Sequence, residues 1–302
     1  MVRISVVLAN YNGDKYLAEA MEGALAQDHD DYEVIVVDDG STDSSRDVIE
    51  EFACRHANRL QAVFLAENQG QGEAFNVGVR HASGEIVCFL DSDDLWRPEK
   101  LQAVDDMFRR YPDAALVQHN LDLHYEGPDE QPSHPTPAMM IGNVYQWAVK
   151  TRRLPMFIPT SGLAFSRHVL QRVLPIPAGF RTCADGYLTR TAMCFGPVLA
   201  MHESLGSYRV HSANSVFGNG NHQQHAYINN VLIPELNRFY RRQGFSLRFN
   251  ASRSAHWRQQ AKRRAWAAVY YSLIWGPARL VQRLTPRVYW RVRVAARHSL
   301  GL

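Results

Sequence analysis

The first 118 residues alternate between short apolar runs and amphipathic helical patterns. Between the runs, apolar residues recur at the three- and four-residue spacing that is typical of helices. Near-continuous apolar strands joined by helices indicate a mostly parallel sheet with helices on both faces. We therefore predict an open α/β fold for this part of the chain. The runs that we interpret as strands are residues 2–9, 33–38, 60–65, 86–90 and 114–118.

Polar residues follow several of these strands at their carboxyl ends. They are Asn10, Asp38–Asp39, Asn68 and Asp91–Asp93. Ligands of parallel α/β sheets bind beyond these ends, so we expect the segments to meet at one edge of the sheet.

Asp91 and Asp93 form an Asp-x-Asp pair directly after the buried strand at residues 86–90. Two carboxylates at the edge of a sheet suit a divalent cation such as Mg²⁺ or Mn²⁺, which would neutralise a phosphate-bearing substrate. An isolated pair of this kind is also typical of a turn or a helix cap. Its interpretation as a metal site therefore depends on the neighbouring segments.

The rest of the chain divides into a second half and a tail. Residues 126–138 hold four prolines and separate a nucleotide-binding half, about residues 1–120, from an acceptor half at about 140–235. We expect helices near 168–173 and 185–195. Residues 213–225 are rich in Asn, Gly and His, which suits either a mobile lid or a surface loop without a role.

The tail at residues 236–302 differs sharply in charge from the predicted domain at residues 1–235. It contains 15 Lys and Arg residues and no acidic residue, whereas the remainder holds 18 basic and 30 acidic residues. Arginines alternate there with aromatic residues, and four of the six tryptophans lie in this tail. A strongly basic tail on an acidic domain indicates a partner with negative charge.

Three interpretations of the basic tail remain open. Its longest uncharged stretch, Ala265–Ala278, has 14 residues, and a spanning helix needs about 20 apolar residues. A helix lying in the membrane interface is therefore our preferred interpretation, with arginines at anionic lipids and aromatic side chains inserted. A helical pair packed on the acidic domain and a nucleic-acid-binding segment are the alternatives.

An ordered set of motifs spans residues 2–216. Asp38-Asp39-Gly40-Ser41 follows the second strand and Asn68-Gln69-Gly70 the third, and Ala9-Asn10 and the Asp91 pair occupy the matching strand ends. Asp185-Gly186-Tyr187-Leu188 and Tyr208-Arg209-Val210-His211 follow in the second half. This set resembles the family 2 glycosyltransferases, whose fold is GT-A, a Rossmann-like mostly parallel sheet with helices on both faces. A C-terminal helical appendage would follow it here.

The resemblance implies a role for each matching residue. Asp39 would bind the base of a nucleotide-sugar donor, and Asp185 would be the catalytic base. Ala184 departs from the family pattern, which usually has Glu before the base. The implied donor-binding residues are Ala9, Asn10, Asp39, Asn68 and Asp91, and the implied ligands of Mn²⁺ or Mg²⁺ are Asp91, Asp93 and His211.

These residue types fit an inverting sugar transfer to an acceptor hydroxyl. A carboxylate such as Asp185 can take the proton of the attacking hydroxyl, and a divalent cation can stabilise the departing diphosphate. We expect a UDP-sugar donor and a lipid-linked or cell-surface glycan as the acceptor. The alternative functions are a helix cap for Asp185 and, for the whole chain, a non-catalytic scaffold at the membrane.

Two further features bear on function class and location. Residues 70–75 imitate a dinucleotide-binding fingerprint, but Phe75 replaces its third Gly and the segment follows the third strand; a dehydrogenase is therefore a poor alternative. The four cysteines show no C-x-x-C spacing, and Met1–Asn10 has the pattern of a strand rather than a leader. We expect a cytoplasmic protein, peripheral on the inner face of the membrane.

Overall fold

The computed structural model describes residues 2–125, 139–211 and 226–250. Residues up to Phe249 form one compact unit, and residues 250–302 form a second unit. The proline-rich segment at 126–138, the segment at 213–225, for which the sequence left a lid and a surface loop open, and the tail beyond residue 250, for which it favoured a membrane helix, all lie outside the described residues.

One eight-stranded sheet organises the first unit, with the strand order β3-β2-β1-β4-β7-β6-β8-β5. The pairs around β1 and β2 and the pair β6–β8 are parallel, whereas β7 runs antiparallel to both of its neighbours. The predicted mostly parallel sheet is confirmed for its first half, and the second half is mixed. The strands are β1 (Ile4–Asn10), β2 (Tyr32–Asp38), β3 (Leu60–Phe64), β4 (Ile86–Asp91), β5 (Leu95–Trp96), β6 (Leu116–Tyr125), β7 (Leu163–Ser166) and β8 (Val198–Val210).

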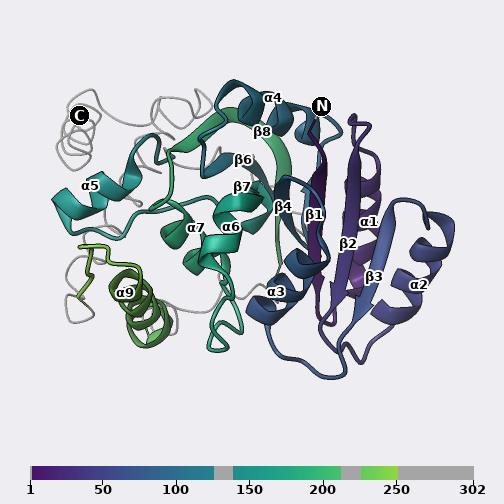
Figure 1. Cartoon of the computed structure of the whole chain (residues 1–302). Coiled ribbons are helices and arrows are strands. Elements are labelled where there is room, and N and C mark those ends of the chain that lie inside the picture. Colours follow the sequence, from purple (N-terminus) through teal and green to yellow (C-terminus); the bar gives the residue numbers. More distant parts are fainter. Residues whose placement is uncertain (1, 126–138, 212–225, 251–302) are drawn as a thin grey trace, which may run out of the picture. The chain divides into compact units, whose positions relative to one another are not determined.

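Helices cover both faces of this sheet (Figure 1). The helices expected near 168–173 and 185–195 are present as α6 and α7. A 3₁₀ turn, η1 (Thr160–Gly162), precedes β7, and a π-helical turn, η2 (Ile228–Leu232), leads into α9. The α-helices are α1 (Asp14–Leu25), α2 (Ser45–Arg55), α3 (Gln71–His81), α4 (Lys100–Arg110), α5 (Val144–Thr151), α6 (Arg167–Val173), α7 (Asp185–Ala192) and α9 (Ile233–Arg242).

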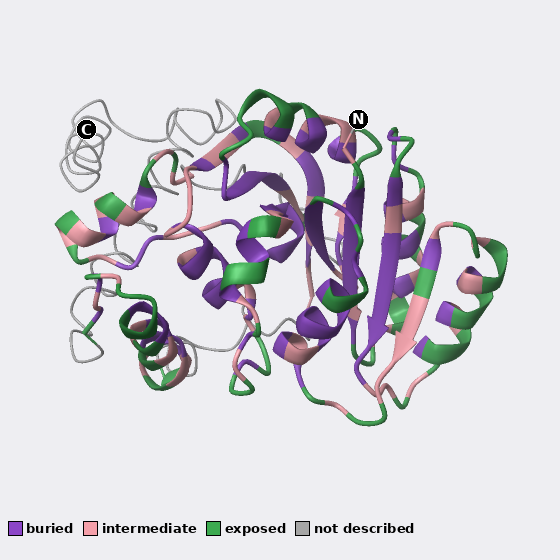
Figure 2. Cartoon of the chain, in the orientation of Figure 1, coloured by how far each residue is buried: buried purple, intermediate pink, exposed green. Residues whose placement is uncertain are grey.

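The central strands are buried on both faces, as Figure 2 shows. Val6 and Leu8 of β1 point into a core that includes side chains of α1, α2 and α4. Val7 points to the opposite face, where α3 packs so closely that a Cβ on Gly78 would lie 2.3 Å from Val7 Cγ1. Burial on both faces explains why these strands are continuous apolar runs rather than alternating ones.

Helix α3 is anchored to the second half of the chain by Asn76. Its buried side-chain amide donates to the carbonyl of Ile176 at 3.0 Å and accepts from the Ile176 backbone N–H at 2.8 Å. Phe75, which replaces the third Gly of the imitated fingerprint, is fully buried with its ring centroid 4.6 Å from that of Phe89. The 70–75 segment therefore begins a helix that packs on the sheet.

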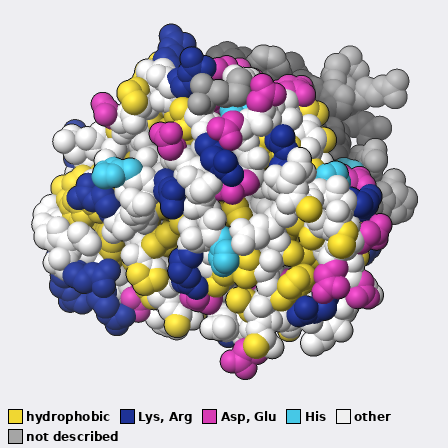
Figure 3. Space-filling view, turned by 45° about the vertical axis from the view of Figure 1, so that its right-hand side comes forward, with side chains coloured by type: hydrophobic (Ala, Val, Ile, Leu, Met, Phe, Trp, Pro, Cys, Tyr) yellow, Lys and Arg dark blue, Asp and Glu magenta, His cyan; other side chains and the backbone are white. Residues whose placement is uncertain are grey.

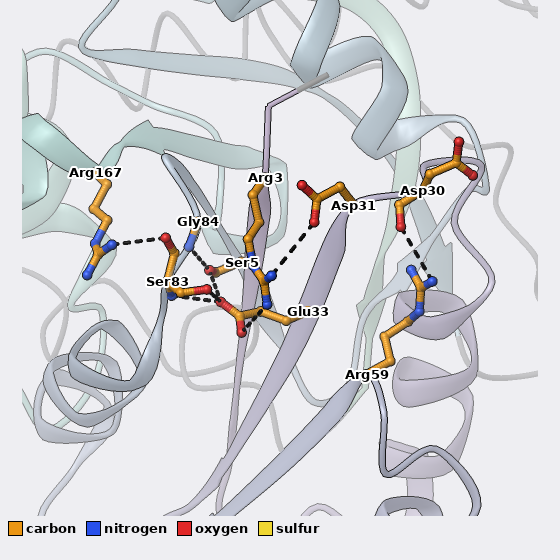
Figure 4. A network of polar contacts seen from close by, with 9 residues as sticks. All are labelled: Arg3, Ser5, Asp30, Asp31, Glu33, Arg59, Ser83, Gly84 and Arg167. Atoms are coloured by element: carbon orange, nitrogen blue, oxygen red, sulfur yellow. Dashed lines mark hydrogen bonds and ion pairs between the residues drawn. The ribbon is translucent and has the colours of Figure 1, made fainter.

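A polar network joins the amino ends of the central strands, at the opposite edge from the predicted site (Figure 4). Glu33 accepts hydrogen bonds from the hydroxyls of Ser5 and Ser83, both at 2.7 Å, and forms an ion pair with Arg3. Burial opposes the ionised form of Glu33, but these hydrogen bonds outweigh it, so the pKa of Glu33 is lowered.

The first unit extends beyond the domain boundary predicted at residue 235. Helix α9 crosses that boundary, and its side chains Leu236, Phe239 and Tyr240 are buried. The Tyr240 hydroxyl donates to the carbonyl of Arg190 on α7 at 2.9 Å, and Phe249 is also buried. The structure therefore places the end of the compact unit at Phe249.

On the face seen in Figure 3, basic and acidic side chains are interspersed. Within the described residues, none of the helices combines the length and the apolar character needed to cross a bilayer.

Candidate active site

The carboxyl ends of β1, β2 and β4 bring the predicted donor-binding residues together. In the sheet register, Ala9 lies opposite Asp91 and Asn10 opposite Asp38. The Asn10 side-chain nitrogen donates to Asp38 Oδ1 at 2.9 Å, and the Asn10 carbonyl accepts from the Asp39 backbone N–H at 2.8 Å. These contacts fix the turn in which Asp39 lies.

Asp39 organises the loop that follows β3. Its two carboxylate oxygens accept the backbone N–H groups of Gln69 and Gly70 at 2.8 and 2.7 Å. Burial raises the pKa of Asp39 despite these hydrogen bonds. Each carboxylate oxygen has a second lone pair, so Asp39 can hold this loop and still accept a hydrogen bond from a ligand.

Asn68 lies in the same loop and contacts the second half of the chain. Its backbone and side-chain oxygens both accept hydrogen bonds from the Arg181 guanidinium. Asp43 accepts the backbone N–H of Ser45 at 3.0 Å and that of Asp14 at 3.1 Å. Asp43 therefore caps the starts of α1 and α2.

Asp91 lies where several carboxylates converge. Burial raises its pKa well above the usual value, and the charges of Asp93, Asp94 and Asp185 raise it further. Asp91 Oδ1 accepts a hydrogen bond from Gln71 Nε2 at 3.0 Å. Crowded carboxylates with raised pKa values at a strand end are typical of a functional site.

Asp93 and Asp94 tie this acidic segment to the end of β8. Asp93 Oδ2 lies 3.1 Å from His211 Nε2. Asp94 is fully buried and accepts the backbone N–H of Arg209 at 2.9 Å, and the Arg209 guanidinium donates to the Asp93 carbonyl at 2.9 Å. The Tyr-Arg-x-His segment and the Asp-x-Asp pair therefore form one structure.

Ser161 and Lys100 support this segment from beneath, and the sequence analysis assigned neither of them a role. The Ser161 hydroxyl accepts the Asp91 backbone N–H at 3.1 Å and donates to Asp94 at 2.5 Å. The backbone carbonyl of Ser161 accepts hydrogen bonds from Lys100 Nζ at 2.7 Å and from the indole N–H of Trp96 at 2.9 Å. No sequence motif marks Ser161, because its partners lie in a segment more than 60 residues away.

Asp185 is the first residue of α7. Burial raises the pKa of its carboxyl group, and the positive charge of Arg190 opposes this effect. Backbone N–H groups of the first turn also hydrogen-bond to the carboxylate, so Asp185 has the contacts expected of a helix-capping acid as well as those of a buried base. The charge of Asp185 acts on Asp91, which places the two residues in one electrostatic environment.

The residues present fit a divalent cation in part. An imidazole nitrogen and a carboxylate oxygen lie side by side at His211 and Asp93, and this donor chemistry suits Mn²⁺. Within residues 2–125, 139–211 and 226–250, no three His, Cys, Asp or Glu side chains are grouped as a metal site. A cation at this edge would therefore need ligands from the substrate or from water.

A hollow of about 510 Å³ lies apart from all these residues, along α5 and the segment after α9. It contains none of the predicted site residues. Its lining side chains are Asn143, Tyr145, Gln146, Trp147, Val149, Lys150 and Ser246.

Comparison with known proteins gives a consistent result. Over residues 5–174 the chain matches the sequence profile described as Glycosyl transferase family 2. An uncharacterized glycosyltransferase of Nostoc sp. is 36% identical over 299 residues, covering 93% of this chain and 88% of the relative. TuaG of Bacillus subtilis, a putative teichuronic acid biosynthesis glycosyltransferase, is 38% identical over 99 residues, 33% of this chain and 39% of the relative.

Solved structures share the fold. TarS of S. aureus in complex with UDP-GlcNAc matches with a TM-score of 0.56 at 19% identity, covering 99% of this chain and 89% of that chain. The mannosyltransferase PcManGT from Pyrobaculum calidifontis, in complex with GDP-Man and Mn²⁺, matches with a TM-score of 0.55 at 20% identity, covering 99% and 86%. These likenesses confirm the α/β fold of GT-A type that the sequence predicts.

Proposed function

The chain belongs to glycosyl transferase family 2 and is a glycosyltransferase that uses a nucleotide-sugar donor, and from this premise we propose that it is an inverting enzyme with Asp185 as its catalytic base. One observation carries the proposal. The charges of Asp93 and Asp185 both act on Asp91, which lies at the carboxyl end of β4, where ligands of α/β folds bind.

We assign the donor to the edge formed by β1, β2 and β4. Asp39, with Ala9 and Asn10 beside it, would bind the base, and Asn68 belongs to the loop that Asp39 holds. Asp91 would bind the ribose. Neighbouring structures with UDP, UDP-GlcNAc or GDP-Man support this class of donor, and we favour a UDP-sugar.

Asp93 and His211, with Asp91, would hold Mn²⁺ or Mg²⁺. When bound, such a cation neutralises the charge that develops on the departing diphosphate. Asp185 accepts the proton of the acceptor hydroxyl while the oxygen of that hydroxyl attacks the anomeric carbon, from the face opposite the diphosphate. A single displacement of this kind inverts the anomeric centre.

The acceptor that we propose is a lipid-linked or cell-surface glycan. TuaG is named for teichuronic acid biosynthesis, and chondroitin synthase of Escherichia coli is 32% identical over 151 residues, 49% of this chain and 20% of that enzyme. The basic, aromatic composition of residues 236–302 supports attachment to an anionic membrane from the cytoplasmic side. Binding of the full chain to vesicles with and without anionic lipid, at rising salt, tests this attachment.

The experiment that tests the reaction begins with a thermal-shift screen across nucleotides, with and without Mn²⁺. Transfer from the matching sugar nucleotide is then followed for wild type and for Asp185→Asn, and the product anomer is read by NMR. We expect the variant to bind the donor normally and to lose transfer, because an amide cannot take the proton. Asp106→Asn, an exposed residue on α4, is the matched control. Parallel loss of donor binding in Asp185→Asn would remove Asp185 as the base.

A further inference from the structure

One side chain connects the donor edge to the helix that carries the proposed base. Gln71 is the first residue of α3. Its Nε2 donates to Asp91 Oδ1 at 3.0 Å, and its Oε1 accepts the backbone N–H of Ala184 at 2.9 Å. Ala184 directly precedes Asp185 at the start of α7. A single amide group therefore spans the distance between Asp91 and the residue before the base.

The chemistry of this bridge requires a carboxamide at this position. Asp91 presents an acceptor and Ala184 presents a donor, so the bridging group must supply both a donor and an acceptor at its tip. Ionised Glu, Lys and Met each lack one or both of these functions. Asn has both functions but is one methylene shorter, so it cannot make both contacts from the same backbone position.

The backbone around Gln71 holds its side chain in place. The backbone N–H groups of Gln71 and Gly72 donate to the carbonyls of Arg181 and Phe180, at 3.0 and 2.8 Å. Gly70 has a φ of +96°, and a Cβ there would lie 2.5 Å from the Cα of Arg181. The start of α3 is therefore packed against the segment that leads into Asp185, and Gln71 has little freedom to move away.

We propose that Gln71 is a positioning residue that couples the donor-binding carboxylate Asp91 to the base-bearing start of α7. When the nucleotide-sugar donor binds Asp91, a shift of Asp91 is thereby transmitted through one amide group to the start of α7, where Asp185 lies. The link to α7 is made by the backbone N–H of Ala184. The inference rests on the proposed role of Asp185 as the base.

The test compares Gln71→Met, which keeps the length of the side chain and removes both hydrogen bonds, with Gln71→Asn, which keeps the amide and loses its reach. We expect kcat to fall about 10- to 100-fold in both variants, since a misplacement of about 1 Å can cost this much. The Kd for nucleotide with Mn²⁺ and the Tm should stay close to wild type. The control is Gln61→Met. Gln61 is an exposed residue of β3 whose side-chain amide contacts the ring of His81 at the end of α3, and its substitution should leave both kcat and Kd unchanged.

Two outcomes would overturn the inference. Wild-type kcat in Gln71→Met would show that the bridge has no role in turnover. A loss of nucleotide affinity equal to the loss of kcat would make Gln71 a donor-binding residue. Asp185→Asn, measured in parallel, separates this inference from the proposed function: if Asp185→Asn keeps transfer, the base assignment fails whatever Gln71 does. If Gln71→Met unfolds, Gln71→Asn carries the comparison.

Discussion

Nε2 of His211 lies 3.1 Å from Oδ2 of Asp93 and thereby joins the end of β8 to the loop after β4. A second contact joins the same two segments, because Asp94 accepts a hydrogen bond from the backbone N–H of Arg209. On the other side, the His211 ring lies 4.8 Å from the ring of Tyr16, centroid to centroid. Residues separated by more than 100 positions in the chain are therefore held as one unit at the edge of the sheet.

The contact between Asp93 and His211 leads to the first prediction. Asp93→Asn should remove the Mn²⁺-dependent part of nucleotide affinity, because an amide oxygen is a weaker ligand for a divalent cation than a carboxylate. His211→Gln should cause a smaller loss of the same kind. Calorimetric titration with nucleotide, with Mn²⁺ or with chelator, measures both effects, and Asp106→Asn serves as the control. Equal nucleotide affinity of wild type with chelator and with Mn²⁺ would contradict a metal at this site.

The second prediction concerns the pH dependence of transfer. The charge of Arg190 acts against burial and lowers the pKa of Asp185 relative to burial alone. Arg190→Gln removes this charge, so the pKa of Asp185 should rise further. Since a base works only when it is deprotonated, the acidic limb of the kcat/KM profile should move to higher pH. Arg172→Gln, on α6 and exposed, is the matched control; an acidic limb that stays in place in Arg190→Gln would show that Asp185 does not govern it.

The first half of the sheet could be predicted from sequence because its strands are buried on both faces. Val34 to Val37 and Ile86 to Leu90 lie in continuous apolar runs between helices. The second half could not be predicted in the same way. Strand β5 has only two residues, and β7 pairs in antiparallel orientation with strands on both of its sides, an arrangement that local periodicity does not encode.

The site could be predicted only where a residue belongs to a motif. Asp39, Asp91 and Asp93 each follow a strand, and the structure brings their segments together. Gln71 and Ser161 belong to no such pattern, since their hydrogen bonds join segments up to 113 residues apart.

The predicted domain boundary at residue 235 rests on charge alone. Helix α9 carries arginines on its exposed side, while its side chains Phe239 and Tyr240 are buried. Composition assigned α9 to the tail, whereas packing assigns it to the first unit.

The third prediction concerns stability and Lys100. Burial lowers the pKa of Lys100 from 10.5 to about 7. Between these values the unfolded chain binds more protons than the folded one, so this group makes stability rise with pH, by up to about 1.4 kcal/mol per pH unit. Lys100→Met should abolish this rise, which urea unfolding at pH 7, 8 and 9 would measure.

Neighbouring groups also titrate near this window, and because they do so in wild type and in Lys100→Met alike, the difference between the two slopes reports Lys100. Burial, together with the charge of Asp93, raises the pKa of Asp94 to about 7, so Asp94 is mostly ionised above it. Burial likewise raises the pKa of Cys88 from 9.0 to about 11, so from about pH 8 upward, where this thiol ionises in the unfolded chain only, Cys88 makes stability fall with pH. Burial lowers the pKa of His119 well below its usual value, so His119 is neutral throughout the window. A slope in Lys100→Met equal to that of wild type would show that Lys100 stays charged in the folded protein.

The last prediction tests where the folded unit ends. A chain cut after Asn250 retains every residue of the first unit, so it should unfold cooperatively and still bind nucleotide. A chain cut after Glu235 loses Leu236, Phe239, Tyr240 and Phe249, all of which are buried. Because removal of one buried Phe side chain costs about 3–5 kcal/mol, and a whole domain is stable by only about 5–15 kcal/mol, the shorter chain should not fold. Circular dichroism and thermal unfolding of the two chains make the comparison. If the shorter chain is folded and binds nucleotide, α9 is an appendage, as its charge suggested; if the longer chain fails to fold, the catalytic unit needs residues 251–302 as well.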